Sequence, residues 1–208
     1  MESNIRLIFL FLILCSLISK GQGDSIFYAS GALKATGAVN DSGVKAGLWN
    51  YYYPDGSISG RFVYSSGELN GNQTYFYPTG TIQAVENWNN GIPEDSASYF
   101  YPNGRQEKIG VYKGGLYQGT WKFYYENGRL KRAGAYMLGS PEGPWTFYHE
   151  NGQLNQVGEL RNGKEHGLWM YYDEDGSKLF EGEWKSGEKA GQWYSFRKGK
   201  KKKWKYFD

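Results

Sequence analysis

The sequence contains almost no cysteine or histidine. Among its 208 residues there is one cysteine, Cys15, and there are two histidines, His149 and His166. A disulfide needs two cysteines, and a zinc site needs several cysteine or histidine ligands at short spacing. We therefore expect no disulfide, no metal site and no cofactor. Packing and backbone hydrogen bonds must hold the fold together.

Signs of catalysis are equally scarce. His149 lies beside a turn, and His166 lies between two glycines of a loop. No glycine-rich loop opens a helix to bind phosphate, and the acidic run at residues 173–175 lacks the further oxygen ligands of a calcium loop. We therefore predict that the protein is not an enzyme and has no catalytic residues.

Only one long apolar run occurs, at residues 7–18, after Arg6 and before small and polar residues that end at Gly23. The run is shorter than the roughly 20 residues that cross a bilayer. Its length and flanks are those of a secretory signal. We predict that residues 1–23 are a signal peptide, cleaved after Gly21 or Gly23, and that the protein is exported to the periplasm, the outer envelope or the medium. An uncleaved anchor is the alternative.

Cys15 lies within this apolar run. Leu14 precedes it, whereas a lipoprotein signal has Gly, Ala or Ser at that place. We therefore do not expect lipidation at Cys15, and the mature chain then has no thiol.

Glycine and aromatic residues, by contrast, are abundant, with 30 glycines and 18% aromatic residues. One glycine recurs every 24 residues, and another follows each of them eleven residues later. The first series is Gly56, Gly80, Gly104, Gly128, Gly152 and Gly176, and the second is Gly67, Gly91, Gly115, Gly139, Gly163 and Gly187. A fixed period indicates tandem copies of one small unit, whose function belongs to a surface rather than to a single pocket.

Residues 119–143 show one unit clearly. Trp121, Phe123 and Tyr125 alternate with other residues, as in a half-buried strand, and Asn127-Gly128 provides a turn. A second strand follows at about 129–136. Its internal Gly134 indicates close approach of another group, such as an aromatic ring from the neighbouring strand. The spacing Gly-x-x-x-Gly is expected to form a second turn.

The expected fold class is all-β. We predict tandem 24-residue β-hairpin repeats that form an elongated, twisted antiparallel meander sheet of about fourteen strands. The array covers residues 24–199, with about seven copies and an amino-terminal half copy. Residues 200–208 are expected to be a basic C-terminal tail.

The repeated pattern is Gly-x-Trp-x-x-Tyr-x-x-x-Gly, then an aromatic residue, then Gly-x-x-x-Gly. Residues 143–152 and 167–176 fit it well. This pattern resembles MORN-type repeats, and more closely the bacterial variant found in YwqK-family antitoxin components. The resemblance covers residues 28–199. It implies a binding or scaffolding array, in some relatives a toxin-neutralising partner and in others a membrane-associated protein, and it brings no catalytic residues.

Two aromatic rows are the first candidate binding residues, because equivalent residues of successive copies should align along the sheet. They are Trp49, Trp121, Trp145, Trp169 and Trp193, with Tyr52, Tyr124, Tyr148 and Tyr172 three residues further on. As an exposed groove these rows would bind a peptide or a glycan. As a structural ladder they would only stabilise the sheet.

A basic cluster at the C-terminus is the second candidate. It comprises Arg197, Lys198, Lys200, Lys201, Lys202, Lys203 and Lys205. The last 12 residues carry a net charge of +6, whereas residues 24–196 carry −4. The cluster would bind an anionic membrane surface or glycan. Alternatively, its lysines protect a sheet edge from association.

These features favour a non-catalytic protein-interaction or scaffolding module, exported and in a narrower form antitoxin-like, with a protein partner. The alternative is a cell-envelope module that recognises anionic lipid or glycan through the tail and the aromatic rows. The export signal and the acidic body disfavour nucleic acid as a partner.

Overall fold

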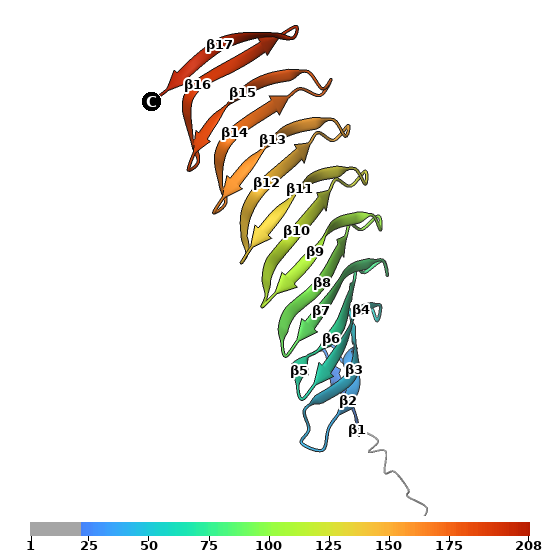
Figure 1. Ribbon diagram of the computed structural model, residues 1–208. Helices are drawn as coiled ribbons and strands as arrows, with labels where there is room; N and C mark the ends of the chain where they lie inside the picture. Colours follow the sequence, from blue (N-terminus) through green and yellow to red (C-terminus); the bar gives the residue numbers. More distant parts are fainter. Residues whose placement is uncertain (1–21) are drawn as a thin grey trace, which may run out of the picture.

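The computed structural model describes residues 22–208, which form one sheet of 17 strands (Figure 1). The predicted signal peptide, with Cys15, lies outside these residues except for Gln22 and Gly23. The strands are β1 (Gln22–Phe27), β2 (Leu33–Val39), β3 (Lys45–Tyr52), β4 (Ile58–Ser65), β5 (Glu68–Leu69), β6 (Gly71–Phe76), β7 (Ile82–Asn89), β8 (Ile92–Phe100), β9 (Gln106–Lys113), β10 (Leu116–Tyr124), β11 (Leu130–Met137), β12 (Ser140–Tyr148), β13 (Leu154–Arg161), β14 (Lys164–Tyr172), β15 (Lys178–Lys185), β16 (Glu188–Arg197) and β17 (Lys200–Phe207).

Each strand pairs antiparallel with its neighbour in the sequence, apart from β4, which pairs with both β5 and β6. Successive strands lie side by side from β1 to β17, and the sheet is a long arched ribbon without a second layer (Figure 1). The predicted elongated, twisted meander of hairpins is confirmed. Within residues 22–208, β1 pairs only with β2 and β17 only with β16, so the sheet has two free edges.

The strand count exceeds the expected fourteen for two reasons: β1 and β17 extend the array at its ends, and the strand that follows β4 is divided into β5 and β6, which both pair with β4. At the C-terminus, residues 200–207 form β17, which pairs with β16 from Arg197↔Lys200 to Gly191↔Phe207. The expected basic tail is therefore the last strand of the sheet. The rings of Trp204 and Phe207 explain this pairing, because they lie 6.3 and 5.9 Å from Trp193 of β16 between ring centroids, while the lysines remain exposed.

The turns at the two ends of the strands differ in type. At one end Asn127-Gly128 forms the predicted loop, in which the Gly128 N–H donates to the Tyr125 carbonyl at 2.8 Å. At the other end two residues with positive φ connect the strands, as in Leu138 (51°) and Gly139 (81°). This is the turn that matches the twist of a hairpin.

The second glycine of Gly-x-x-x-Gly does not lie in a turn, contrary to the prediction. Gly167 has a φ of 69° and lies inside β14, where the pairing with β13 shifts register. In the third copy Asp95 adopts the same conformation, with a φ of 68°. This glycine is therefore needed for a β-bulge, a local kink that curves each strand.

Leu138 occupies a turn position that favours asparagine or glycine, because the left-handed conformation costs other residues about 1–2 kcal/mol. Its side chain is 74% exposed and contributes little packing. We predict that Leu138→Asn stabilises the protein by about 1 kcal/mol. Thermal unfolding followed by circular dichroism measures this. The reciprocal Asn162→Leu, in the next copy, should destabilise by a similar amount; equal melting temperatures for both variants would contradict the prediction.

The core consists of tryptophans that lie flat on glycines of the preceding strand. A Cβ atom built on Gly134 would lie 2.1 Å from Trp145 Cδ2, and one on Gly158 would lie 2.2 Å from Trp169 Cδ2. The Trp145 indole N–H donates to the Ala135 carbonyl at 3.2 Å. The close approach that the strand glycines predicted is confirmed. It lets a single-layer sheet bury whole indole rings.

Two copies replace both partners of this pair. Most copies have a strand glycine and, eleven or twelve residues later, a tryptophan. The second copy has Phe62 and Gln73 at these two positions, and the third has Glu86 and Ala97. Gln73 is fully buried and retains the hydrogen bond of the indole, since its Nε2 donates to the Val63 carbonyl at 3.2 Å. In both copies, a residue larger than glycine on the first strand is therefore paired with a residue smaller than tryptophan on the second.

Successive hairpins are also joined by side-chain hydrogen bonds at the loop end. The Tyr125 hydroxyl donates to the Tyr148 carbonyl at 2.7 Å, and Tyr101 donates to the Tyr124 carbonyl at 2.8 Å. In the next copy His149 Nε2 lies 2.9 Å from the Tyr172 carbonyl. These contacts position each hairpin against the next and keep the sheet continuous.

Candidate binding face

The tryptophans of the first predicted row are buried. Trp49, Trp121, Trp145, Trp169 and Trp193 are each at most 2% exposed. Each lies beneath neighbouring side chains; Tyr117, for example, stacks on Trp121 with 3.7 Å between ring centroids and an interplanar angle of 14°. These tryptophans form the core of one face of the sheet, which we call the tryptophan face. A ligand does not reach their rings directly.

The tyrosines of the second predicted row lie on the other side of the sheet. Tyr52, Tyr124, Tyr148 and Tyr172 stand three residues after a tryptophan, and side chains of a strand alternate between faces. They are half-buried at the ends of their strands. The structure therefore does not combine the two predicted rows into one groove.

A different aromatic row accompanies the tryptophans on their face. Two positions after each tryptophan or its replacement stands an aromatic residue, except after Trp193, where Ser195 stands; the row is Tyr51, Tyr75, Tyr99, Phe123, Phe147 and Tyr171. All are half-buried, and Phe147 lies 5.8 Å from Trp145 and 6.0 Å from Trp169 between ring centroids. Alternation along the strand is the sequence signal for this row, whereas the predicted row is the one whose tyrosines recur most regularly.

Cationic side chains lie over these rings. Lys108 Nζ is 4.0 Å from the centroid of Tyr99, and the Arg132 guanidinium is 4.3 Å from that of Phe123. Towards the ends of the array, Lys45 lies 4.6 Å from Trp49 and Lys189 lies 4.4 Å from Trp193. Cation–π contacts of this kind stabilise the face and give it positive charge.

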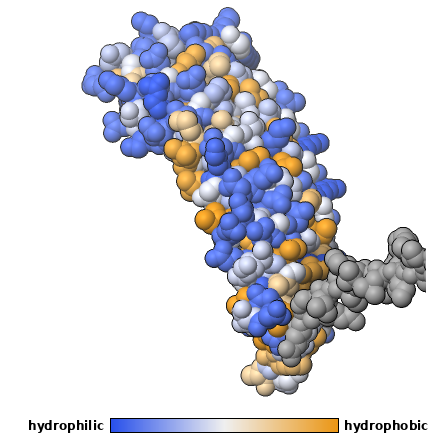
Figure 2. All heavy atoms as spheres, turned by 60° about the horizontal axis from the view of Figure 1, so that its bottom comes forward, coloured by the Kyte–Doolittle hydropathy of each residue, from blue (hydrophilic) through white to orange (hydrophobic). Residues whose placement is uncertain are grey.

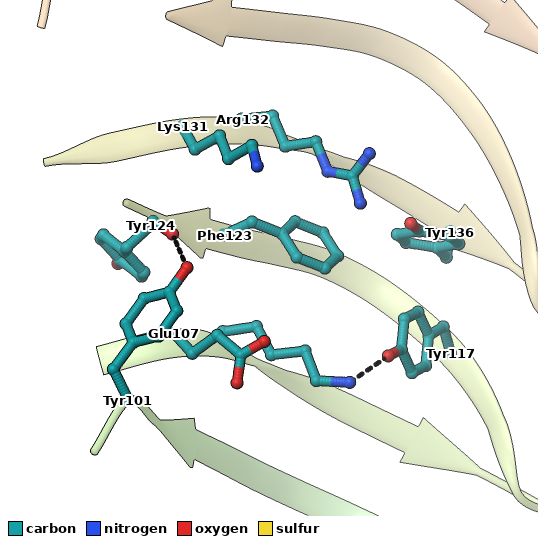
Figure 3. Close-up of a pocket in the computed structure, with 9 residues that line it drawn as sticks. Tyr101, Glu107, Tyr117, Phe123, Tyr124, Lys131, Arg132 and Tyr136 are labelled. Atoms are coloured by element: carbon teal, nitrogen blue, oxygen red, sulfur yellow. Dashed lines mark hydrogen bonds between the residues drawn. The ribbon is translucent and has the colours of Figure 1, made fainter. Parts of the chain in front are cut away.

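A hollow of about 330 Å³ opens on this face in the middle of the array (Figure 3). Its lining residues are Tyr101, Glu107, Lys108, Tyr117, Phe123, Tyr124, Lys131, Arg132 and Tyr136. Tyr124, whose side chain belongs to the opposite face, meets this side through its backbone carbonyl, which accepts from the Tyr101 hydroxyl at 2.8 Å. Lys131 and Arg132 are adjacent in β11, yet both side chains extend towards the hollow (Figure 3). A bulge explains this, because Phe123 pairs with Arg132 and Tyr124 with Leu130, which leaves Lys131 without a partner residue.

Burial raises the pKa of several tyrosines on the tryptophan face. The pKa of Tyr64 rises to about 12, and that of Tyr171 likewise to about 12, in each case mainly through desolvation. The pKa of Tyr99 rises further, because its hydroxyl also donates to Glu86. These hydroxyls therefore remain neutral donors across the physiological pH range.

We predict that the array loses stability in alkali. A tyrosine pKa that is raised in the folded state contributes stability that is complete below pH 10 and is lost as the pH rises through about 12. Tyrosine absorbance at 295 nm and far-ultraviolet circular dichroism should therefore change together above pH 10. Complete ionisation near pH 10 with unchanged dichroism would contradict this.

The predicted basic cluster lies on the free edge strand β17, on the turn before it and, with Arg197, on the last residue of β16. Lys201 forms an ion pair with Glu181 at 2.5 Å and lies 3.9 Å from the Tyr194 ring centroid. Arg197, Lys198, Lys200, Lys202, Lys203 and Lys205 have no carboxylate within ion-pair distance in residues 22–208. In the space-filling view the end furthest from the N-terminal residues is largely hydrophilic (Figure 2).

Over the described part of the chain, no three His, Cys, Asp or Glu side chains are grouped as metal ligands would be. Nor do residues 22–208 contain a helix of the length and hydrophobicity that a membrane span requires.

The fold and this face define the class of the protein: an open antiparallel array of β-hairpin repeats, suited to binding or scaffolding. Four segments match the family model described as the MORN repeat variant, namely residues 69–90, 117–136, 141–162 and 165–186. The match supports the MORN-type resemblance of the repeats. A comparison with curated proteins gives no match.

Solved structures show only faint similarity. The crystal structure of TcdB2-TccC3-Cdc42 contains a chain with 10% identity and a TM-score of 0.20, over 84% of this chain and 13% of that chain. In the Photorhabdus luminescens Tc holotoxin pore the values are 11% and 0.20, over 83% of this chain and 11% of that chain. With TM-scores this low, neither structure bears on fold or function.

Proposed function

We propose that this protein is a non-catalytic interaction module, exported from the cell, that binds a protein partner along its tryptophan face. The observation that carries the proposal is the row of six half-buried rings, with cations over them, along one face of a long sheet. Tyrosine, phenylalanine and arginine are enriched in protein interfaces, and repeat arrays bind partners along extended surfaces.

Site-specific photo-crosslinking tests which face binds. A photoreactive amino acid in place of Tyr136, on the tryptophan face, should capture a partner in cells of the source organism. The same amino acid in place of Leu168 is the control, since this residue is 51% exposed and precedes Trp169 on the opposite side of its strand. Equal capture from both positions, or capture from Leu168 alone, would contradict the proposed face.

Export is tested with residues 1–23 fused to alkaline phosphatase, which is active only after translocation. We expect activity from this fusion and none from one lacking residues 1–23. Gln22 and Gly23 pair with Val39 and Ala38, so cleavage after Gly21 would leave β1 complete. N-terminal sequencing of the mature protein distinguishes this site from cleavage after Gly23; an inactive fusion would refute export.

The narrower form of the proposal is an antitoxin-like role, which rests on the resemblance of the repeats to YwqK-family components. It is tested by expressing neighbouring reading frames with and without this protein. Growth arrest by a neighbour that this protein relieves would support neutralisation, whereas neighbours that are harmless alone would count against it.

Binding of an anionic membrane surface is a second candidate function, favoured by the lysines of β17 that have no carboxylate partner. Each basic residue near an anionic surface contributes about 1 kcal/mol. Vesicles containing phosphatidylglycerol should sediment the protein, and a variant with Lys200, Lys202, Lys203 and Lys205 changed to glutamine should stay in solution. Equal sedimentation of both proteins would exclude this edge as the lipid contact.

A further inference from the structure

The central hollow differs from the rest of the tryptophan face in charge. Lys108 and Arg132 occupy equivalent positions in successive copies, each between two aromatic residues of neighbouring strands; Arg132, for example, pairs with both Phe123 and Phe147. The other copies have Ala35, Gly60, Ala84, Gln156 and Phe180 at this position. The fold therefore does not require a cation here, since five copies form the same sheet without one.

Arg132 has unused hydrogen-bonding capacity. Its Nε atom is buried and has no hydrogen-bond partner among residues 22–208. No carboxylate of these residues lies within ion-pair distance of its guanidinium. Buried donors are nearly always satisfied by protein groups or ordered water, so the Arg132 guanidinium retains a donor for an acceptor that enters the hollow. A carboxylate suits a guanidinium best, because the two groups can form paired hydrogen bonds.

The surroundings of Arg132 add further donors and an elongated shape. Lys108 Nζ donates to the Tyr117 hydroxyl at 2.7 Å, and Lys131 extends over the same hollow. On the far side of Lys131 and Arg132 lies a second hollow of about 400 Å³, whose lining includes Glu150 and Glu174 and therefore disfavours an acidic ligand. The first hollow has three cations against the single carboxylate of Glu107, and its lining extends over β9, β10 and β11; we call it the groove. Such a groove suits an extended chain rather than a compact ion.

We propose that this groove binds an acidic peptide segment of the protein partner and that Arg132 anchors one of its carboxylates. The inference rests on the proposed function, because it names the chemistry of the partner on the same face. Phe123 orients the guanidinium by stacking beneath it, and Lys108 and Lys131 hold neighbouring carboxylates. Glu107, on the rim, disfavours a second negative charge close by and so spaces the acidic residues of the ligand.

The test measures binding of a fluorescent hexaglutamate peptide by fluorescence anisotropy. All proteins carry Lys200, Lys202, Lys203 and Lys205 changed to glutamine, so that the edge strand contributes little. Arg132→Gln should weaken binding at least about tenfold, since a charge-assisted hydrogen bond is lost. The fold should persist because glutamine occupies the equivalent position 156. Circular dichroism confirms this.

Lys122→Gln is the matched control. Lys122 lies in the adjacent strand β10, between Trp121 and Phe123, and is exposed on the opposite face. It should leave the affinity within about twofold of the parent protein, as expected for a distant surface charge. Equal losses from Arg132→Gln and Lys122→Gln would show attraction to overall charge and would overturn the inference, as would unchanged binding by Arg132→Gln.

Competing ions separate a carboxylate site from a phosphate site. Glutarate should displace the peptide at lower concentration than inorganic phosphate; the reverse order would reassign the groove to phosphate and overturn the proposal.

Failure of the peptide-binding groove and failure of the proposed function give different experimental results. Crosslinking at Tyr136 with unchanged peptide binding by Arg132→Gln would retain the interaction face and reject the groove. Arg132-dependent peptide binding without any crosslinked partner would support the groove and reject the proposed function.

Discussion

Replacing Trp145 by alanine is expected to destabilise the protein by about 3–5 kcal/mol, the range for removing a large aromatic residue from a core. Trp145 is 2% exposed and lies on Gly134 in the middle of the array. The sheet has no second layer that could move into the space. The indole also satisfies the Ala135 carbonyl, which would lose its hydrogen bond. Both effects act on the contact between β11 and β12.

Removing the Trp145 side chain should also divide the array into two parts that unfold separately. Each repeat contacts only its neighbours, so a weak interface lets the two sides unfold separately. Urea denaturation followed by tryptophan fluorescence and by circular dichroism should therefore change from one transition to two. Tyr206→Ala is the control, because Tyr206 is 64% exposed on the edge strand, where substitutions usually change stability by about 0.5 kcal/mol or less. A single transition with a loss below 1 kcal/mol for Trp145→Ala would refute the core role.

Gly158→Phe is expected to have an effect of similar size by the opposite mechanism. A Cβ atom at this position would lie 2.2 Å from Trp169 Cδ2, so a whole benzyl group must displace the indole. Overpacking typically costs about 1–3 kcal/mol, and we expect more here because the clash is with a buried ring in a single layer.

The second copy indicates a second substitution that should restore part of the stability that Gly158→Phe removes. It carries Phe62 and Gln73 where other copies have glycine and tryptophan. The double variant Gly158→Phe/Trp169→Gln should therefore be less destabilised than the sum of its single variants, by at least about 1 kcal/mol. Denaturation of the four proteins of this cycle measures the coupling. Strict additivity would show that the side chains at positions 158 and 169 do not compete for the same space.

The repeat made most of the fold predictable. Glycines at a period of 24 residues predicted the hairpins, because the turn and bulge conformations need positive φ, as at Gly128 and Gly167. The pairing of strand glycine with tryptophan was also predictable from the chain itself, since both are replaced in the same two copies. The role of the second glycine of each pair was not, because a turn and a bulge both call for positive φ.

The candidate site was predictable only in part. The aromatic rows were recognised by their regularity, but regularity does not tell which row is accessible. Tyr124 and Phe123 are adjacent in the sequence and lie on opposite faces of the sheet. The period of 24 residues puts Lys108 and Arg132 in equivalent positions, but only the sheet shows that both pair with Phe123 and line one hollow.

The sequence by itself determined the unit of this protein: its length, its turns, its alternating strands and the tryptophan that each copy contributes. These are local properties, fixed by backbone conformation and side-chain alternation over a few residues. Only the tertiary structure decided which aromatic rings are buried, that the basic segment is the edge strand, and that three cations line one hollow, one of them with a buried, unpaired donor. Those outcomes depend on what neighbouring strands place beside each residue, since in a single sheet burial comes from the adjacent hairpin rather than from an opposing layer.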